Sequence, residues 1–154
     1  MKEKLDFIRL PLLLVALFFV GKLAMGALDA SYEVGNRVFS MVILQTHLAL
    51  LWAAVGRRYR GYGLKDAVLS VVMIVAASQI LILLATAGSY LTGIDTHFNY
   101  PEALGLPGPV EFGAAMVSRL GGLVVNCIFG AVLGLIGWSL GGLIPAGTAA
   151  SRNG

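Results

Sequence analysis

Five polar side chains lie inside otherwise apolar stretches of this sequence: Lys22, Gln45, His47, Gln79 and Asn126. In a membrane-crossing helix such groups cost free energy, so each is a candidate for a functional role. Gln45, His47 and Gln79 lie near the middle of their stretches, whereas Lys22 and Asn126 lie nearer one end. If neighbouring stretches run antiparallel, the five can meet in one layer. They form our candidate mid-membrane polar site.

Three of these residues have a structural interpretation as well. Lys22 shares a helical face with Asp29 and Glu33, so its long stem can carry the ammonium outward toward those acids. Gln79 and Asn126 can join helices through hydrogen bonds worth about 0.6 to 2 kcal/mol each. On this interpretation the polar layer holds the fold together and does not handle a ligand.

Gln45 and His47 are two residues apart, so they point about 200° apart on a helix and cannot face the same neighbour. Either their helix is central in the bundle, or one of its faces meets another subunit. His47 shares its face with Asn36 and Ser40. An intramembrane histidine can ligate haem, take part in proton or substrate movement, or hydrogen-bond a neighbouring helix. Axial haem ligation usually needs a partner, and the other histidine, His97, lies in a predicted loop.

The composition is that of an integral membrane protein. Of 154 residues, 58% are hydrophobic and 12% are charged, and the mean hydropathy is +0.85. Soluble domains are about 25% charged. The formal charge of +3 comes from basic residues at the ends of apolar stretches, so we do not expect nucleic acid as a partner. The expected partners are the lipid bilayer and other membrane subunits or a second copy of this chain.

Four apolar stretches, each about as long as a membrane-crossing helix, predict an all-α four-helix transmembrane bundle in one domain, residues 1–154. The predicted spans are about residues 10–28, 38–55, 67–91 and 118–144. The first also resembles a signal peptide, whose cleavage would remove residues 1–26, but we expect it to be retained.

The predicted spans are joined by two polar turns and one long loop. Residues 29–37 and 56–66 are the turns, and residues 92–117 form the loop between the third and fourth spans. Pro101 and Pro109 each suit the first position of a helix, so we expect two short helices within that loop.

The basic residues predict the orientation. Eight lie in the amino terminus, the 56–66 turn and the tail, against two in the other connections. The eight are Lys2, Lys4, Arg9, Arg57, Arg58, Arg60, Lys65 and Arg152, and the two are Arg37 and Arg119. Both termini should therefore face the cytoplasm, with the 92–117 loop outside, in what we expect to be a prokaryotic cytoplasmic membrane. The basic residues of the 56–66 turn fix this topology and can also bind anionic headgroups.

One face of the fourth span is poor in side chains. Asn126, Gly130, Gly134, Gly137 and Gly141 fall within about 80° of one another on a helix. Glycines four residues apart let another helix approach closely. We expect this helix-packing face to contact a helix, either of this chain or of another copy.

The sequence shows no enzyme signature. It lacks the spacing patterns of metalloproteases, serine hydrolases and phosphate-binding loops, and it has one cysteine, Cys127, which we expect to be a small core residue. We expect no metal and no cofactor. Our leading hypothesis is a non-enzymatic membrane protein that acts through helix association, as a homo-oligomer or a small subunit. The alternative is a small-solute or ion transporter or channel that uses the polar layer, and a weaker alternative is a haem-bearing redox subunit.

Overall fold

The computed structural model describes residues 2–28, 30–105 and 108–144, and these ranges contain α-helices and no strand. The helices are α1 (Lys2–Ala27), α2 (Tyr32–Val38), α3 (Met41–Arg60), α4 (Leu64–Thr92), α5 (Pro101–Leu104) and α6 (Phe112–Gly141). The predicted all-α class is confirmed.

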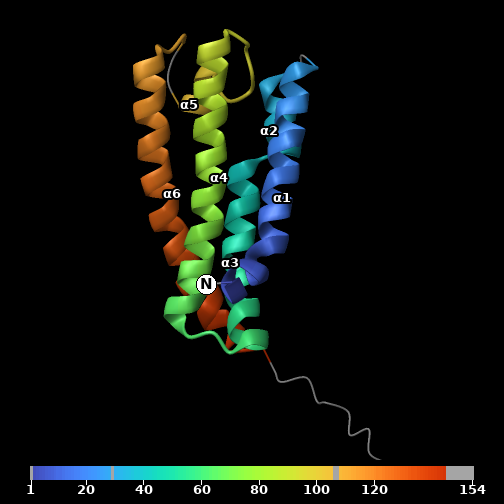
Figure 1. The fold of residues 1–154 in the computed structure, drawn as a ribbon, viewed down its shortest axis with the longest axis vertical. Helices are drawn as coiled ribbons and strands as arrows, with labels where there is room; N and C mark the ends of the chain where they lie inside the picture. The colour runs from blue at the N-terminus through green and yellow to red at the C-terminus, as the bar shows by residue number, and fades with distance from the viewer. Residues whose placement is uncertain (1, 29, 106–107, 145–154) are drawn as a thin grey trace, which may run out of the picture.

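Four segments of the described chain are long and apolar enough to cross a membrane, as predicted. They are α1 from Glu3, the pair α2 and α3 taken together as Tyr32–Arg60, α4 and α6. In Figure 1, α4 stands between α6 and α1, and α3 packs against all three in the lower half of the bundle. The second span is therefore two helices with a break at residues 39 and 40.

The bundle has two chemically different ends (Figure 1). The start of α1, the turn from α3 to α4 and the end of α6 lie together at what we call the basic end. The end of α1, the start of α2 and the described residues 93–105 and 108–111, which we call the 93–111 segment, lie together at the opposite end, the loop end. The candidate spans therefore alternate in direction.

Residues 29–37 are not the polar turn that the sequence predicted, because most of them form α2. The Ser31 hydroxyl caps this helix by accepting a hydrogen bond from the Val34 amide at 3.5 Å. Gly35 of α2 is buried against the imidazole of His97. The helix thus depends on a contact with a segment about sixty residues away, which local composition does not reveal.

The 92–117 loop is shorter than predicted. A helix begins at Pro101, as expected, and it is α5. The second short helix expected at Pro109 does not form, because residues 109–111 precede a long helix that begins at Phe112 with Glu111 as its N-cap. The fourth span therefore begins at Phe112 and not near residue 118.

The helix-packing face of α6 lies against α3 and α4 of the same chain. A side chain at Gly130 would meet Val75 of α4, and a side chain at Gly141 would come within 2.6 Å of the Ala54 carbonyl oxygen of α3. The opposite side of α6, including Val125 and Ile128, is exposed. The close approach that the glycines predict is therefore made within one chain.

Two tryptophans join neighbouring segments at the basic end through hydrogen bonds. The Trp52 indole donates to the Phe7 carbonyl oxygen at 2.8 Å, which joins α3 to α1. The Trp138 indole donates to the Tyr62 carbonyl oxygen at 2.9 Å, which joins α6 to the turn between α3 and α4. An ion pair between Lys4 and Asp66 adds a link from α1 to α4.

Candidate functional site

The five residues of the predicted polar layer do not meet in one place. Gln45, Gln79 and Asn126 meet inside the bundle, Lys22 lies nearer the loop end, and His47 lies on the outer surface. The predicted single site is therefore divided into three environments with different chemistry.

The three amides form a hydrogen-bonded chain, which we call the amide chain. Gln79 Nε2 donates to Gln45 Oε1 at 3.0 Å, and Gln45 Nε2 donates to Asn126 Oδ1 at 2.8 Å. Asn126 Nδ2 then donates to the Gly122 carbonyl oxygen at 2.7 Å, within α6. The chain joins α4, α3 and α6, and its groups satisfy one another, so this arrangement suits helix packing better than ligand binding.

His47 points away from the amide chain. Its side chain is exposed, and Nδ1 lies 2.8 Å from the Ile43 carbonyl oxygen one turn earlier. Because a carbonyl only accepts, Nδ1 carries the hydrogen, and in the neutral ring Nε2 is then an acceptor on the outer surface. Gln45 of the same helix is buried, so the predicted opposition of the two side chains is present.

Lys22 turns into the bundle. Its side chain is only 6% exposed, and its ammonium donates to Asn36 Oδ1 of α2 at 3.1 Å. The ammonium also lies 5.3 Å from the ring centroid of Tyr32 and 5.5 Å from that of Phe98. The expected outward path toward Glu33 is not taken, since Glu33 is exposed and lies 3.8 Å from Arg37. Asp29 lies outside the described residues.

Arg119 is a site residue that the sequence analysis counted with the connections, because it is the second residue of the predicted fourth span. It lies two turns inside α6, where its Nε donates to Thr86 Oγ1 and its NH1 to the Ala103 carbonyl oxygen, both at 2.9 Å. Its NH2 donates to the Phe98 carbonyl oxygen. Because α6 begins at Phe112, this arginine lies well inside the span and not at its end, where the sequence analysis placed it.

Lys22 and Arg119 line the same small cavity near the loop end, which we call the cationic cavity. Its volume is about 70 Å³. Residues from α1, α2, α3, α4, α6 and the 93–111 segment surround it: Lys22, Tyr32, Asn36, Met41, Val42, Ile82, Phe98, Ala103 and Arg119. A cavity needs about 10 to 15 Å³ to hold one water, so this one has room for several waters or a small polar group.

His97 lies next to Phe98, a residue of the wall of the cationic cavity. Its ring is fully buried, and Nε2 lies 2.8 Å from the Ala30 carbonyl oxygen. Gly26 of α1 and Gly35 of α2 leave the space that the ring occupies. The imidazole lies next to Phe98, whose ring faces the Lys22 ammonium, and its Nδ1 is buried without a hydrogen-bond partner among the described residues.

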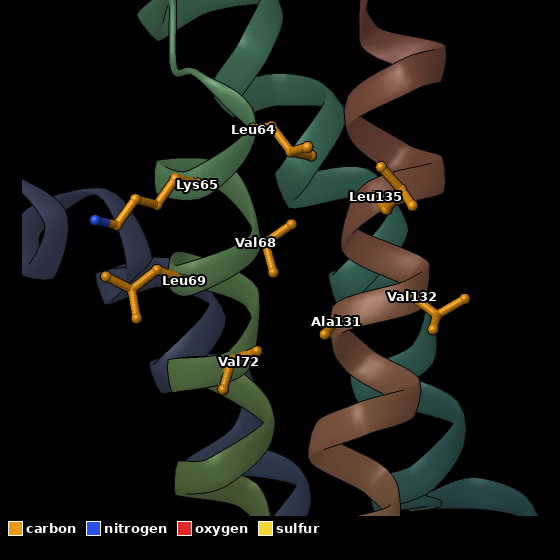
Figure 2. A pocket seen from close by; sticks show the side chains of 8 residues that line it. All are labelled: Leu64, Lys65, Val68, Leu69, Val72, Ala131, Val132 and Leu135. Atoms are coloured by element: carbon orange, nitrogen blue, oxygen red, sulfur yellow. The ribbon is translucent and has the colours of Figure 1, made fainter.

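A larger hollow lies on the outer surface between α4 and α6, with a volume of about 640 Å³ (Figure 2). Its lining is apolar apart from Lys65, whose ammonium points away from α6 in Figure 2. In a bilayer, acyl chains can fill such a groove. It offers no polar group that would select a solute.

The basic residues of the 56–66 turn differ in their surroundings. The guanidinium carbon of Arg57 lies 3.8 Å from the Trp138 ring centroid, and Arg57 donates to the Trp138 carbonyl oxygen at 3.0 Å. Arg58 lies 5.9 Å from the Tyr59 ring centroid, and Arg60 lies 5.9 Å from that of Phe7. Lys65 is exposed. Arg57 therefore belongs to the packing between α3 and α6.

No protein-family model, curated protein or solved structure matches this chain. Among the described residues, no three histidine, cysteine, aspartate or glutamate side chains are grouped so that they could hold a metal ion.

Proposed function

We propose that this protein is a small-solute membrane protein of the transporter or channel type, with the cationic cavity as its solute site. One observation carries the proposal: Lys22, Asn36 and Arg119 line one small cavity between the helices, so that two cations meet inside the bundle. Ionisable groups inside a membrane protein are costly and commonly mark a solute pathway. The amide chain and His47, which were candidates for this role, lie outside the cavity.

The break in the second span supports this role. Irregular backbone at membrane depth is tolerated where it is buried in protein or lines a polar cavity. Met41 and Val42, directly after the break, line the cationic cavity. Broken helices with a binding site at the break are a recurrent feature of transporters.

We propose further that the loop end faces the outside and that both termini are cytoplasmic. The basic residues of the α1 start and the α3–α4 turn gather at the opposite end of the bundle, which agrees with the excess of lysine and arginine on cytoplasmic sides. A solute would then enter beside the 93–111 segment. Lys22 lies five residues before the end of α1, or about 7.5 Å along the helix axis, so the path is short.

Thiol labelling tests this access. Cys127 is the sole cysteine, so Cys127→Ser gives a cysteine-free chain in which Ile82→Cys places one thiol in the cavity wall. Ile74→Cys, two turns away in α4 and also buried, is the matched control. In sealed vesicles, a membrane-impermeant methanethiosulfonate should label the thiol at 82 and not the one at 74. Equal protection of both thiols from either side of the membrane would refute a solute site here.

Helix association remains a second candidate function, because of His47. At the depth of the amide chain its Nε2 acceptor faces outward, and hydrocarbon offers it no donor. A helix of a second copy, or of another membrane subunit, could supply one. The helix-packing face of α6 no longer supports this candidate, because it is covered within the chain.

Native mass spectrometry of the detergent-solubilised protein tests this association. His47→Leu should lower the assembly mass, whereas Leu84→Ala, an exposed position of α4, should leave it unchanged. A wild-type protein that is already monomeric, or an unchanged mass after His47→Leu, would count against association through this face.

A further inference from the structure

We infer that the cationic cavity binds an oxyanion group, a carboxylate or a phosphate, of its ligand. This inference rests on the proposed function, since it names the chemical class of the solute. It is argued from the charges, the hydrogen-bond donors and the helix terminus that meet at the cavity.

The charges at the cavity are of one sign. Lys22 and Arg119 both line it, and neither forms an ion pair with any residue that the structure describes. Glu102, which precedes Ala103 of the cavity wall, is exposed and is not among the lining residues. Two partly or fully buried cations without a counter-charge are costly, and an anion between them offsets that cost.

The hydrogen-bonding groups at the cavity are mainly donors. The Lys22 ammonium has three N–H groups and uses one on Asn36, whose Oδ1 is thereby occupied. Arg119 has five N–H groups and uses three, on Thr86, Ala103 and Phe98. The Asn36 amide nitrogen and the Tyr32 hydroxyl are further donors at the wall. A ligand that complements this wall must bring acceptors.

The start of α3 adds a favourable partial charge. Met41 and Val42 are the first two residues of this twenty-residue helix, and both line the cavity. The Ser40 hydroxyl accepts from the Ile43 amide at 3.4 Å, while the amides of Met41 and Val42 have no acceptor within the helix. The positive end of the α3 dipole thus lies at the same place as the two cations, which favours an anion.

The size of the cavity fits one small group. A volume of about 70 Å³ accepts a carboxylate or a phosphate but not a large solute. The group can belong to a water-soluble anion or to a lipid headgroup, since the cavity lies only about 7.5 Å below the end of α1. The oxyanion chemistry is the same in both cases, and the experiment separates the two sources.

The experiment uses the full chain with Cys127→Ser and Ile82→Cys, reconstituted in vesicles of neutral lipid. Labelling rates are measured for an anionic and a cationic methanethiosulfonate and divided by their rates at an exposed thiol, Thr92→Cys. The normalised rate should be roughly tenfold higher for the anionic reagent, the factor expected for one charge-assisted contact. Inorganic phosphate or acetate should slow the labelling, and glycerol should not. Met41→Cys provides a second reporter if Ile82→Cys does not fold.

Charge variants link the effect to the cavity. Lys22→Met should remove most of the anionic preference and the protection by phosphate. Lys22→Gln, which keeps a donor and removes the charge, should give an intermediate result. Arg37→Gln is the matched control, because it removes an exposed cation next to Asn36 and outside the cavity, and it should keep both effects.

The outcomes separate the two proposals. Protection by phosphatidylglycerol in the vesicles, without protection by free phosphate, would support the oxyanion and identify a headgroup as its source. Labelling that favours the cationic reagent, or that only glycerol slows, would overturn the oxyanion and leave the solute site standing. No labelling of either reporter thiol by either reagent would refute the solute site itself.

Discussion

Gly137 of α6 lies directly against the backbone of Leu50 in α3, and a Cβ atom at Gly137 would overlap the Leu50 carbonyl group. A backbone group cannot move aside as a flexible side chain can. The separation of α3 and α6 at this level is therefore set by the missing side chain, as is expected where helices pack through small residues.

Gly137→Ala should consequently destabilise the protein by about 1 to 3 kcal/mol, the usual cost of overpacking. Gly121→Ala is the control, because the same methyl group on the same helix would meet nothing within 4 Å. The free energy of unfolding in mixed micelles measures both variants. Equal free energies of unfolding for the two variants would show that the backbones of α3 and α6 do not lie in contact at Gly137.

Removing a member of the amide chain should cost more at its centre than at its end. Gln79→Leu leaves one atom without a partner, Gln45 Oε1, whereas Gln45→Leu leaves both Gln79 Nε2 and Asn126 Oδ1. At about 0.6 to 1.7 kcal/mol per interhelical bond, Gln45→Leu should cost about twice as much as Gln79→Leu. Because the two residues share a bond, the double variant should cost less than the sum. If the losses in free energy of unfolding were strictly additive, this would contradict the hydrogen bond between Gln45 and Gln79.

Gly35→Ala should loosen the 93–100 segment, because the new methyl group would overlap the His97 imidazole. Hydrogen exchange followed by mass spectrometry should show faster exchange there, whereas Gly88→Ala, with nothing within 4 Å, should change little. Adding Gly35→Ala to a His97→Ala background should have almost no further effect, since the obstacle is gone. An equal effect in both backgrounds would mean that the ring does not occupy this space.

Arg57→Lys should lower stability by about 0.5 to 2 kcal/mol although the charge is kept. The guanidinium stacks on the Trp138 ring at 3.8 Å, and an ammonium does not reproduce that planar contact. Arg60→Lys is the control, because Arg60 is exposed and lies 5.9 Å from the Phe7 ring. Melting temperatures in detergent compare the two. A purely topological role for Arg57 would leave both variants like the wild type.

Features that follow from local periodicity were predictable from the sequence. Apolar stretches of about span length predicted the four long apolar segments, and helical angles predicted that Gln45 and His47 face opposite ways. The same reasoning indicated the side-chain-poor face of α6. Periodicity gives the direction of a side chain but not the neighbour that it meets, so the contact of this face with α3 and α4 of the same chain was left open.

The cationic cavity could not be predicted from the sequence for a related reason. Lys22, Asn36 and Phe98 come from three different parts of the chain, and no spacing rule predicts that they meet. Arg119 was missed because the sequence placed it at the end of the fourth span, whereas the helix begins seven residues earlier, at Phe112. Helix α2 was missed because a glycine-containing polar stretch is stabilised by a distant histidine. These features arise from tertiary contacts.

The break between α2 and α3 gives the second span a mechanical property that α4 and α6 lack. The Phe39 amide bonds back to the Gly35 carbonyl oxygen and the Leu44 amide to the Ser40 carbonyl oxygen, so the backbone ladder is interrupted between them. Bending the chain at this point breaks fewer helical hydrogen bonds than bending an uninterrupted rod. The second span can therefore bend at residues 39 and 40 at a lower cost in backbone hydrogen bonds than α4 or α6 can bend along their length.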